Sequence, residues 1–146
     1  MNINKILSEA LKIVFNEKKK IGSNYGEDEK FIYWMPDGYR IFKIPQKDFL
    51  IDLKKALPNK MPLNNPNKFL NDIESEVAIK TNEIKAIDKG QVIKIKGEKS
   101  HAWINIKYLK EFNSDCTFKI INQKSPLFVY ENEEIVGVIL PVYVRD

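Results

Sequence analysis

The sequence predicts an α+β fold in which helices pack on largely antiparallel sheets. Two observations lead to this prediction. Helical periodicity is confined to a few segments, most of them in the first 60 residues, whereas from residue 75 onward the apolar residues fall in short runs separated by turn-forming residues. Runs of strands interrupted by single helices are typical of α+β domains rather than of parallel α/β sheets.

Residues 3–16 are expected to form the first helix. Asn2 or Asn4 is a suitable N-cap, and Lys18-Lys19-Lys20 follows at the C-terminal end, where positive charge is favourable. The polar stretch 22–30 is predicted to be a loop. The expected apolar face of the helix consists of residues at three- and four-residue spacing: Ile3, Ile6, Leu7, Ala10, Leu11, Val14 and Phe15.

A β-hairpin is predicted over residues 31–44. Residues 31–35 form one apolar strand, residues 39–44 form the return strand, and Pro36-Asp37-Gly38 supplies the turn. Residues 46–57 are predicted to be a second helix, which Pro58 ends. Three prolines and four asparagines in 58–68 indicate a linker-like insertion, and we expect one domain over residues 1–146 with this insertion inside it.

The second half of the chain is expected to be mostly β. Asn82 and Lys89-Gly90 divide the first apolar runs, and residues 92–96 alternate strictly, so one face of that strand meets water. Asn105 is predicted to cap a short helix that begins at Ile106. Three final strands are predicted over 116–121, 126–130 and 135–144.

The composition limits the function. The longest apolar run, 136–144, is far shorter than the roughly 20 residues that span a bilayer, so we expect a cytoplasmic protein without a membrane partner. The net charge of +4 comes almost entirely from lysine, which suits weak attraction to a phosphate backbone more than specific base recognition.

The sequence contains little that favours catalysis. There is one histidine, His101, which we expect in an exposed loop, and one cysteine, Cys116, which we expect to be a small buried side chain. Glycine-rich phosphate loops and clustered metal ligands do not occur in the sequence. We therefore expect a protein that is not an enzyme and that uses no cofactor or metal. Trp34 and Trp103 are expected to pack in a core.

Several short motifs occur in an order that resembles the last domain of the bacterial DNA sliding clamp, the β subunit of the replicative polymerase. They are Asn105 with Tyr108-Leu109 at a helix start, Ser125-Pro126 at a strand, and Leu140-Pro141-Val142 in the last strand. Upstream, Asp37-Gly38-Tyr39-Arg40-Ile41 is similar to another strand of that family, and Ile44-Pro45 to its entry into a helix.

The resemblance implies a sliding-clamp-like module with a hydrophobic groove for linear peptides of replication or repair proteins. It also implies that the hairpin 31–44 and the strand 135–144 lie close together. Arg40 would pair with a peptide carboxylate or carbonyl. The groove residues that the resemblance implies are Gly38, Tyr39, Arg40, Ile41, Asn105, Tyr108, Pro126, Ile139, Leu140, Pro141 and Val142.

The chain is too short for the three domains of a clamp subunit, so encircling DNA would require a homo-oligomer. The alternative is an oligomeric protein that binds or encircles duplex DNA. The small size and the richness in Lys, Ile and Asn would suit a phage or mobile-element protein. Lysines expected to contact the DNA backbone are Lys5, Lys12, Lys18, Lys19, Lys20, Lys107 and Lys110.

Overall fold

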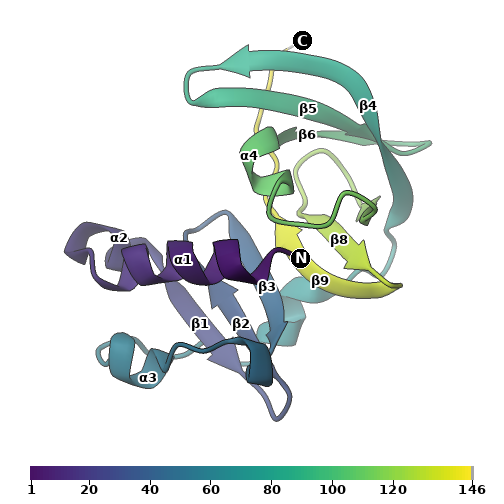
Figure 1. The fold of residues 1–146 in the computed structure, drawn as a ribbon. Helices are drawn as coiled ribbons and strands as arrows, with labels where there is room; N and C mark the ends of the chain where they lie inside the picture. Colours follow the sequence, from purple (N-terminus) through teal and green to yellow (C-terminus); the bar gives the residue numbers. More distant parts are fainter. Residues whose placement is uncertain (146) are drawn as a thin grey trace. The chain divides into compact units, whose positions relative to one another are not determined.

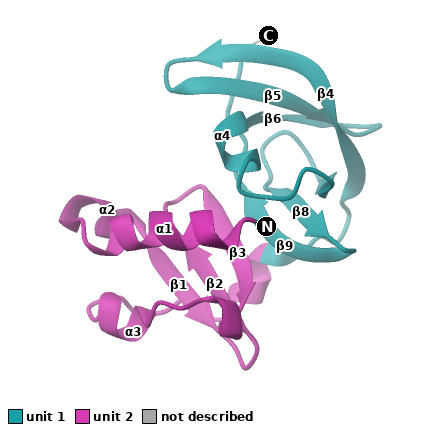
Figure 2. Cartoon of the chain, in the orientation of Figure 1, with its two compact units in different colours: residues 1, 70–146 teal, residues 2–69 magenta. Residues whose placement is uncertain are grey.

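A computed structural model describes residues 1–145, which form two compact units (Figures 1 and 2). The first unit contains residues 2–69, and the second contains Met1 with the chain from Leu70 onward. Each unit combines short helices with antiparallel strands, so the predicted α+β class is confirmed. The linker-like stretch 58–68 lies at the end of the first unit.

The first unit contains a three-stranded antiparallel sheet in the order β1-β2-β3. The predicted hairpin is confirmed: β2 (Phe31–Met35) pairs with β3 (Arg40–Pro45), with Trp34 opposite Phe42. A strand that we predicted to be a loop, β1 (Asn24–Glu27), pairs with β2. The asparagine and the glycine in this segment are typical of loops, which is why the strand was not predicted. Tyr25 is buried, and its carbonyl oxygen accepts a hydrogen bond from the Leu63 N–H at 2.7 Å.

Helix α1 (Ile3–Val14) begins at the Asn2 cap, whose side chain accepts a hydrogen bond from the Lys5 N–H. The predicted helix is confirmed, but its core-facing stripe differs from the expected one. Ile13 is buried, whereas Phe15 is 83% exposed, because the helix ends at Val14. The lysine triplet lies inside an unpredicted helix, α2 (Glu17–Gly22), which Asn16 caps.

The predicted helix over 46–57 is wrong. The segment contains a 3₁₀ turn, η1 (Gln46–Asp48), an extended residue at Phe49, and the short helix α3 (Leu53–Ala56). Asp52 starts α3 by accepting from the Lys55 N–H, and this cap interrupts the helical run. Phe49 is buried while Leu50 is 81% exposed, so these two residues do not share the single apolar helix face that the sequence predicts. A further 3₁₀ segment, η2 (Pro66–Leu70), follows in the linker-like region.

The second unit contains six antiparallel strands in the order β9-β8-β7-β4-β5-β6. Strand β4 (Glu76–Ile87) belongs to two parts of this sheet, because residues 76–78 pair with β7 and residues 79–87 pair with β5. We expected Asn82 to separate two strands, but it lies at a register shift within β4. The other strands are β5 (Gly90–Lys96), β6 (His101–Asn105), β7 (Thr117–Ile120), β8 (Leu127–Glu131) and β9 (Glu134–Ile139).

The two ends of this sheet meet through the C-terminal segment. The predicted strand 135–144 stops as β9 at Ile139, since Pro141 has no N–H to continue a ladder. The chain then crosses to β6, where Val142 forms an isolated antiparallel bridge with Trp103. This bridge connects the C-terminal segment to the β6 edge of the sheet. The predicted helix after Asn105 is confirmed as α4 (Ile106–Leu109).

Candidate functional site

The bridge between β6 and the C-terminal segment borders a cavity of about 220 Å³ in the second unit. Ligand pockets for drug-sized molecules usually measure about 300–1,000 Å³, so this cavity suits one or two side chains better than a cofactor. Its walls come from β6, the β7–β8 loop and the C-terminal segment, and they include His101, Trp103, Lys124, Pro141, Val142 and Tyr143.

The alternation of β5 and β6 places Trp103 beside lysines. Directly opposed residues share a face, and the pairs Ile93–Ile104 and Ile95–Ala102 are buried on one face. The opposite face carries the pairs Lys94–Trp103 and Lys96–His101. The Trp103 side chain is only 6% exposed because other groups cover it.

Two ammonium groups lie over the indole ring of Trp103. Lys85 Nζ is 4.8 Å from the ring, and Lys94 Nζ is 5.9 Å from it. Lys94 also pairs with Glu83 at 3.2 Å, which keeps its ammonium group near the ring. The indole Nε1 of Trp103 is buried, and it has no hydrogen-bond partner among the described residues.

Two loops fix the polar wall of the cavity. In the β5–β6 loop, the Glu76 carboxylate accepts hydrogen bonds from the N–H groups of Lys99 (2.9 Å) and Ser100 (3.2 Å), and His101 follows directly. In the β7–β8 loop, the Asn122 side chain accepts from the N–H of Lys124 at 2.8 Å. These side-chain-to-backbone bonds hold His101 and Lys124 at the cavity without using their own side chains.

The predicted groove residues of the second unit fall into two sets. Pro141 and Val142 line the cavity, and Leu140 next to them is 38% exposed. The other predicted residues do not line the cavity. Ile139 is fully buried, and Tyr108 and Pro126 are half-buried. The Asn105 side chain caps α4 by accepting a hydrogen bond from the Lys107 N–H.

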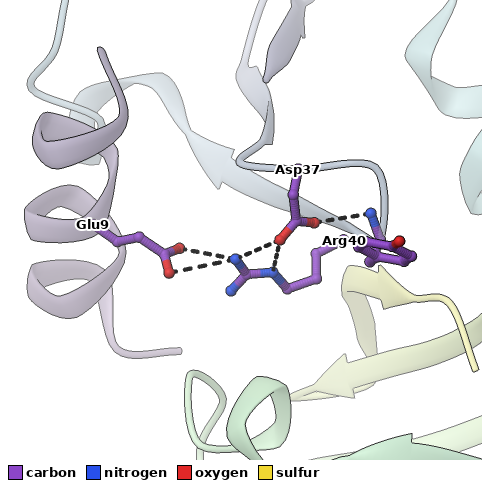
Figure 3. A network of polar contacts seen from close by, with 4 residues as sticks. Glu9, Asp37 and Arg40 are labelled. Carbon is purple, nitrogen blue, oxygen red and sulfur yellow. Dashed lines mark hydrogen bonds and ion pairs between the residues drawn. The ribbon is translucent and has the colours of Figure 1, made fainter. Parts of the chain in front are cut away.

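Among the predicted groove residues of the first unit, Arg40 belongs to an ion-pair network with Glu9 and Asp37 (Figure 3). The guanidinium group of Arg40 lies 2.9 Å from Asp37 Oδ2 and 3.2 Å from Glu9 Oε1. Arg40 is 5% exposed, and these two carboxylates pair with its charge within the unit. Ile41 is also buried, whereas Gly38 and Tyr39 are exposed at the turn.

The lysines that we predicted to contact DNA are on the surface of both units. Lys5, Lys12, Lys18 and Lys19 are exposed on α1 and α2, and Lys20 pairs with Glu17. Lys107 and Lys110 are exposed at α4 in the second unit.

Sequence reasoning missed His101, Trp103, Lys124 and Tyr143 as members of a site. His101 was predicted in an exposed loop, but it begins β6 and is half-buried. One signal in the sequence could have indicated these residues. The strict alternation of residues 92–96 predicts a strand with lysines on one face, and the side chains of a neighbouring strand that pair with these lysines lie on the same face. Cys116 was expected to be buried, but it is half-buried; this partial burial raises the pKa of its thiol.

No protein-family model, curated protein or solved structure matches the chain. The sliding-clamp resemblance therefore depends on the sequence motifs alone. None of the helices between residues 1 and 145 is long and apolar enough to cross a membrane.

Proposed function

We propose that the chain is a non-catalytic, sliding-clamp-like interaction protein that binds linear peptide motifs of replication or repair proteins. The binding site is the cavity between β6 and the C-terminal segment. One observation carries this proposal: Pro141 and Val142, which the resemblance implies as groove residues, line a cavity beside the outer edge of β6.

The cavity has the chemistry that a peptide anchor needs. Pro141 and Val142 provide the apolar wall that a leucine or aromatic side chain can contact, since Trp103, which also lines the cavity, is only 6% exposed. Next to the Trp103–Val142 bridge, the outer edge of β6 offers further main-chain groups with which an extended peptide can pair. An apolar anchor together with main-chain pairing is the usual way in which small grooves bind short motifs at micromolar strength.

A titration with a clamp-binding peptide that carries leucine and phenylalanine anchors tests this proposal. Val142→Glu places a charge in the cavity and is expected to weaken binding by about 1–3 kcal/mol. Val77→Glu is the matched control, because Val77 is 65% exposed on β4 and does not line the cavity. Equal binding by both variants, or no binding by the unaltered protein at millimolar peptide, contradicts the proposal.

The second candidate is an oligomeric protein that binds or encircles duplex DNA. The exposed lysines of α1 and α2 favour it, and Lys5 and Lys12 lie on the same face of α1 because they are two turns apart. Duplex affinity is then expected to fall steeply with added salt and to weaken in the variant Lys5→Gln/Lys12→Gln. A protein that light scattering shows to be a monomer at all concentrations cannot form a ring.

A further inference from the structure

Basic side chains surround the proposed peptide cavity. Lys124 and His101 line it, and Lys96 lies opposite His101. Lys94 covers Trp103, but Glu83 pairs with it at 3.2 Å, so the rim charge comes from the other lysines. A second hollow shares Val142 and Tyr143 with the first, and Lys89 and Arg145 border it. No Asp or Glu is among the described residues that line the first cavity, and Asp88 is the single acidic residue along the second. The apolar cavity therefore has a positively charged rim.

The outer edge of β6 adds main-chain recognition beside this rim. β6 pairs with β5 along one side, and on the other side it pairs, among residues 1–145, only through Trp103 and Val142. The carbonyl group of Trp103 points to this outer side, where it accepts the hydrogen bond from Val142. In a strand, residues two positions apart point their N–H and C=O groups to the same side. The main-chain groups of His101 therefore point to the outer side as well.

These features favour a peptide over a nucleic acid as the negatively charged partner. A single strand of nucleic acid binds largely by stacking its bases on exposed aromatic rings, but Trp103 is 6% exposed beneath Lys85 and Lys94. The outer edge of β6 is already paired at Trp103, so the main-chain groups of His101 are the ones that can pair with a peptide main chain, which alternates donors and acceptors. We propose that the partner segment is an extended peptide with an apolar anchor flanked by Asp or Glu, a proposal that rests on the peptide-binding function proposed above.

Three peptides of about ten residues test this. They share a central Leu-Phe pair and differ only in having aspartate, serine or lysine on both sides of it. We expect the aspartate peptide to bind about tenfold more tightly than the serine peptide, since several rim charges each contribute modestly. The difference should shrink between about 0.05 M and about 0.5 M salt, because added ions screen exposed charges.

Two charge-reversal variants locate the effect. Lys124→Glu changes an exposed side chain of the cavity wall and is expected to remove the preference for the aspartate peptide. Lys47→Glu changes the net charge equally, but it lies in η1 of the first unit, so the preference should persist. Circular dichroism spectra of both variants serve as the check that each is folded.

The outcomes separate the two proposals. Equal affinity for all three peptides contradicts the acidic partner but leaves the peptide-binding function standing. Absence of binding by every peptide contradicts both. A single-stranded oligonucleotide that binds more tightly than the aspartate peptide, and loses affinity in Lys124→Glu, assigns the charged rim to nucleic acid and overturns this inference.

Discussion

The main-chain N–H of Val142 donates a hydrogen bond to the carbonyl oxygen of Trp103 at 2.8 Å. This bond joins the segment after β9 to β6, two parts of the second unit that are 39 positions apart in the chain. It holds one apolar wall of the cavity against the other. The integrity of the proposed site therefore depends on a contact that no local sequence pattern encodes.

Replacing Val142 with proline removes this donor and is expected to destabilise the second unit by about 1 kcal/mol, the usual net value of one hydrogen bond. Urea unfolding measures the change. Val144→Pro is the matched control, because no hydrogen bond of its N–H is described within residues 1–145. An equal loss of stability in both variants would show that the bridge is not responsible.

Arg40 is expected to be a stability determinant of the first unit. Arg40→Met leaves the carboxylates of Glu9 and Asp37 without their shared guanidinium group (Figure 3). Bonds to charged groups contribute about 1.5–3 kcal/mol, so we expect a loss of this size in thermal unfolding. Arg145→Met, at an exposed arginine, should change stability by less than about 0.5 kcal/mol. Stability unchanged in Arg40→Met would be inconsistent with the network.

Stability is expected to fall at both extremes of pH because of one hydrogen-bonded pair in the first unit. The Tyr33 hydroxyl lies 2.6 Å from Asp28 Oδ2. Burial and this carboxylate raise the pKa of Tyr33 above its ordinary value of 10.0, so the contribution of Tyr33 is lost as pH rises above about 10. The hydrogen bond from Tyr33 lowers the pKa of Asp28 below 3.8, so the contribution of Asp28 is lost as pH falls below about 4.

The variant Tyr33→Phe tests this pH dependence. Phenylalanine has no hydroxyl to ionise, so the loss of stability above about pH 10 that is due to residue 33 should disappear. In an NMR titration of the carboxyl groups, the pKa of Asp28 should return toward its ordinary value. Tyr143→Phe, at a ring that is 80% exposed and lies in the second unit, is the control and should leave the Asp28 titration unchanged. An unchanged Asp28 pKa in Tyr33→Phe would contradict the assigned cause.

A side chain at Gly97 is expected to displace the Glu76 carboxylate, because an added Cβ would overlap it. Glu76 would have to leave the N–H groups of Lys99 and Ser100, which costs about 1–2 kcal/mol in unfolding measurements. Gly22→Ala is the control, since a Cβ at that position meets nothing within 4 Å. A neutral effect of Gly97→Ala would show that the loop holds His101 by other contacts.

The sequence predicted the elements whose determinants are local. The Asn2 and Asn105 caps and the hairpin turn at Asp37-Gly38 are each specified by a few neighbouring residues, and each is present. The helix predicted over 46–57 failed because Asp52 offers a competing cap in the middle of an apolar periodic run. β1 was missed because its burial comes from Leu63 and Pro66, which lie far along the chain.

The site was predicted only in part, for a similar reason. The motifs indicated Pro141 and Val142, but the cavity also needs Trp103 and Lys124, which tertiary pairing brings to it. The sliding-clamp resemblance implied that Arg40 pairs with a peptide, and in the structure its guanidinium group pairs with Glu9 on α1. The expected proximity of the hairpin 31–44 and the strand 135–144 stays a prediction, because these segments belong to different units.

The most direct test of the account is an NMR titration of the protein with the aspartate-flanked peptide. The account predicts that the largest chemical-shift changes occur at the Trp103 indole N–H and at the amides of Val142 and Lys124, while the indole of Trp34, buried in the first unit, does not move. Changes confined to α1, α2 or the Trp34 indole, with those of Trp103 and Val142 unaffected, would contradict it.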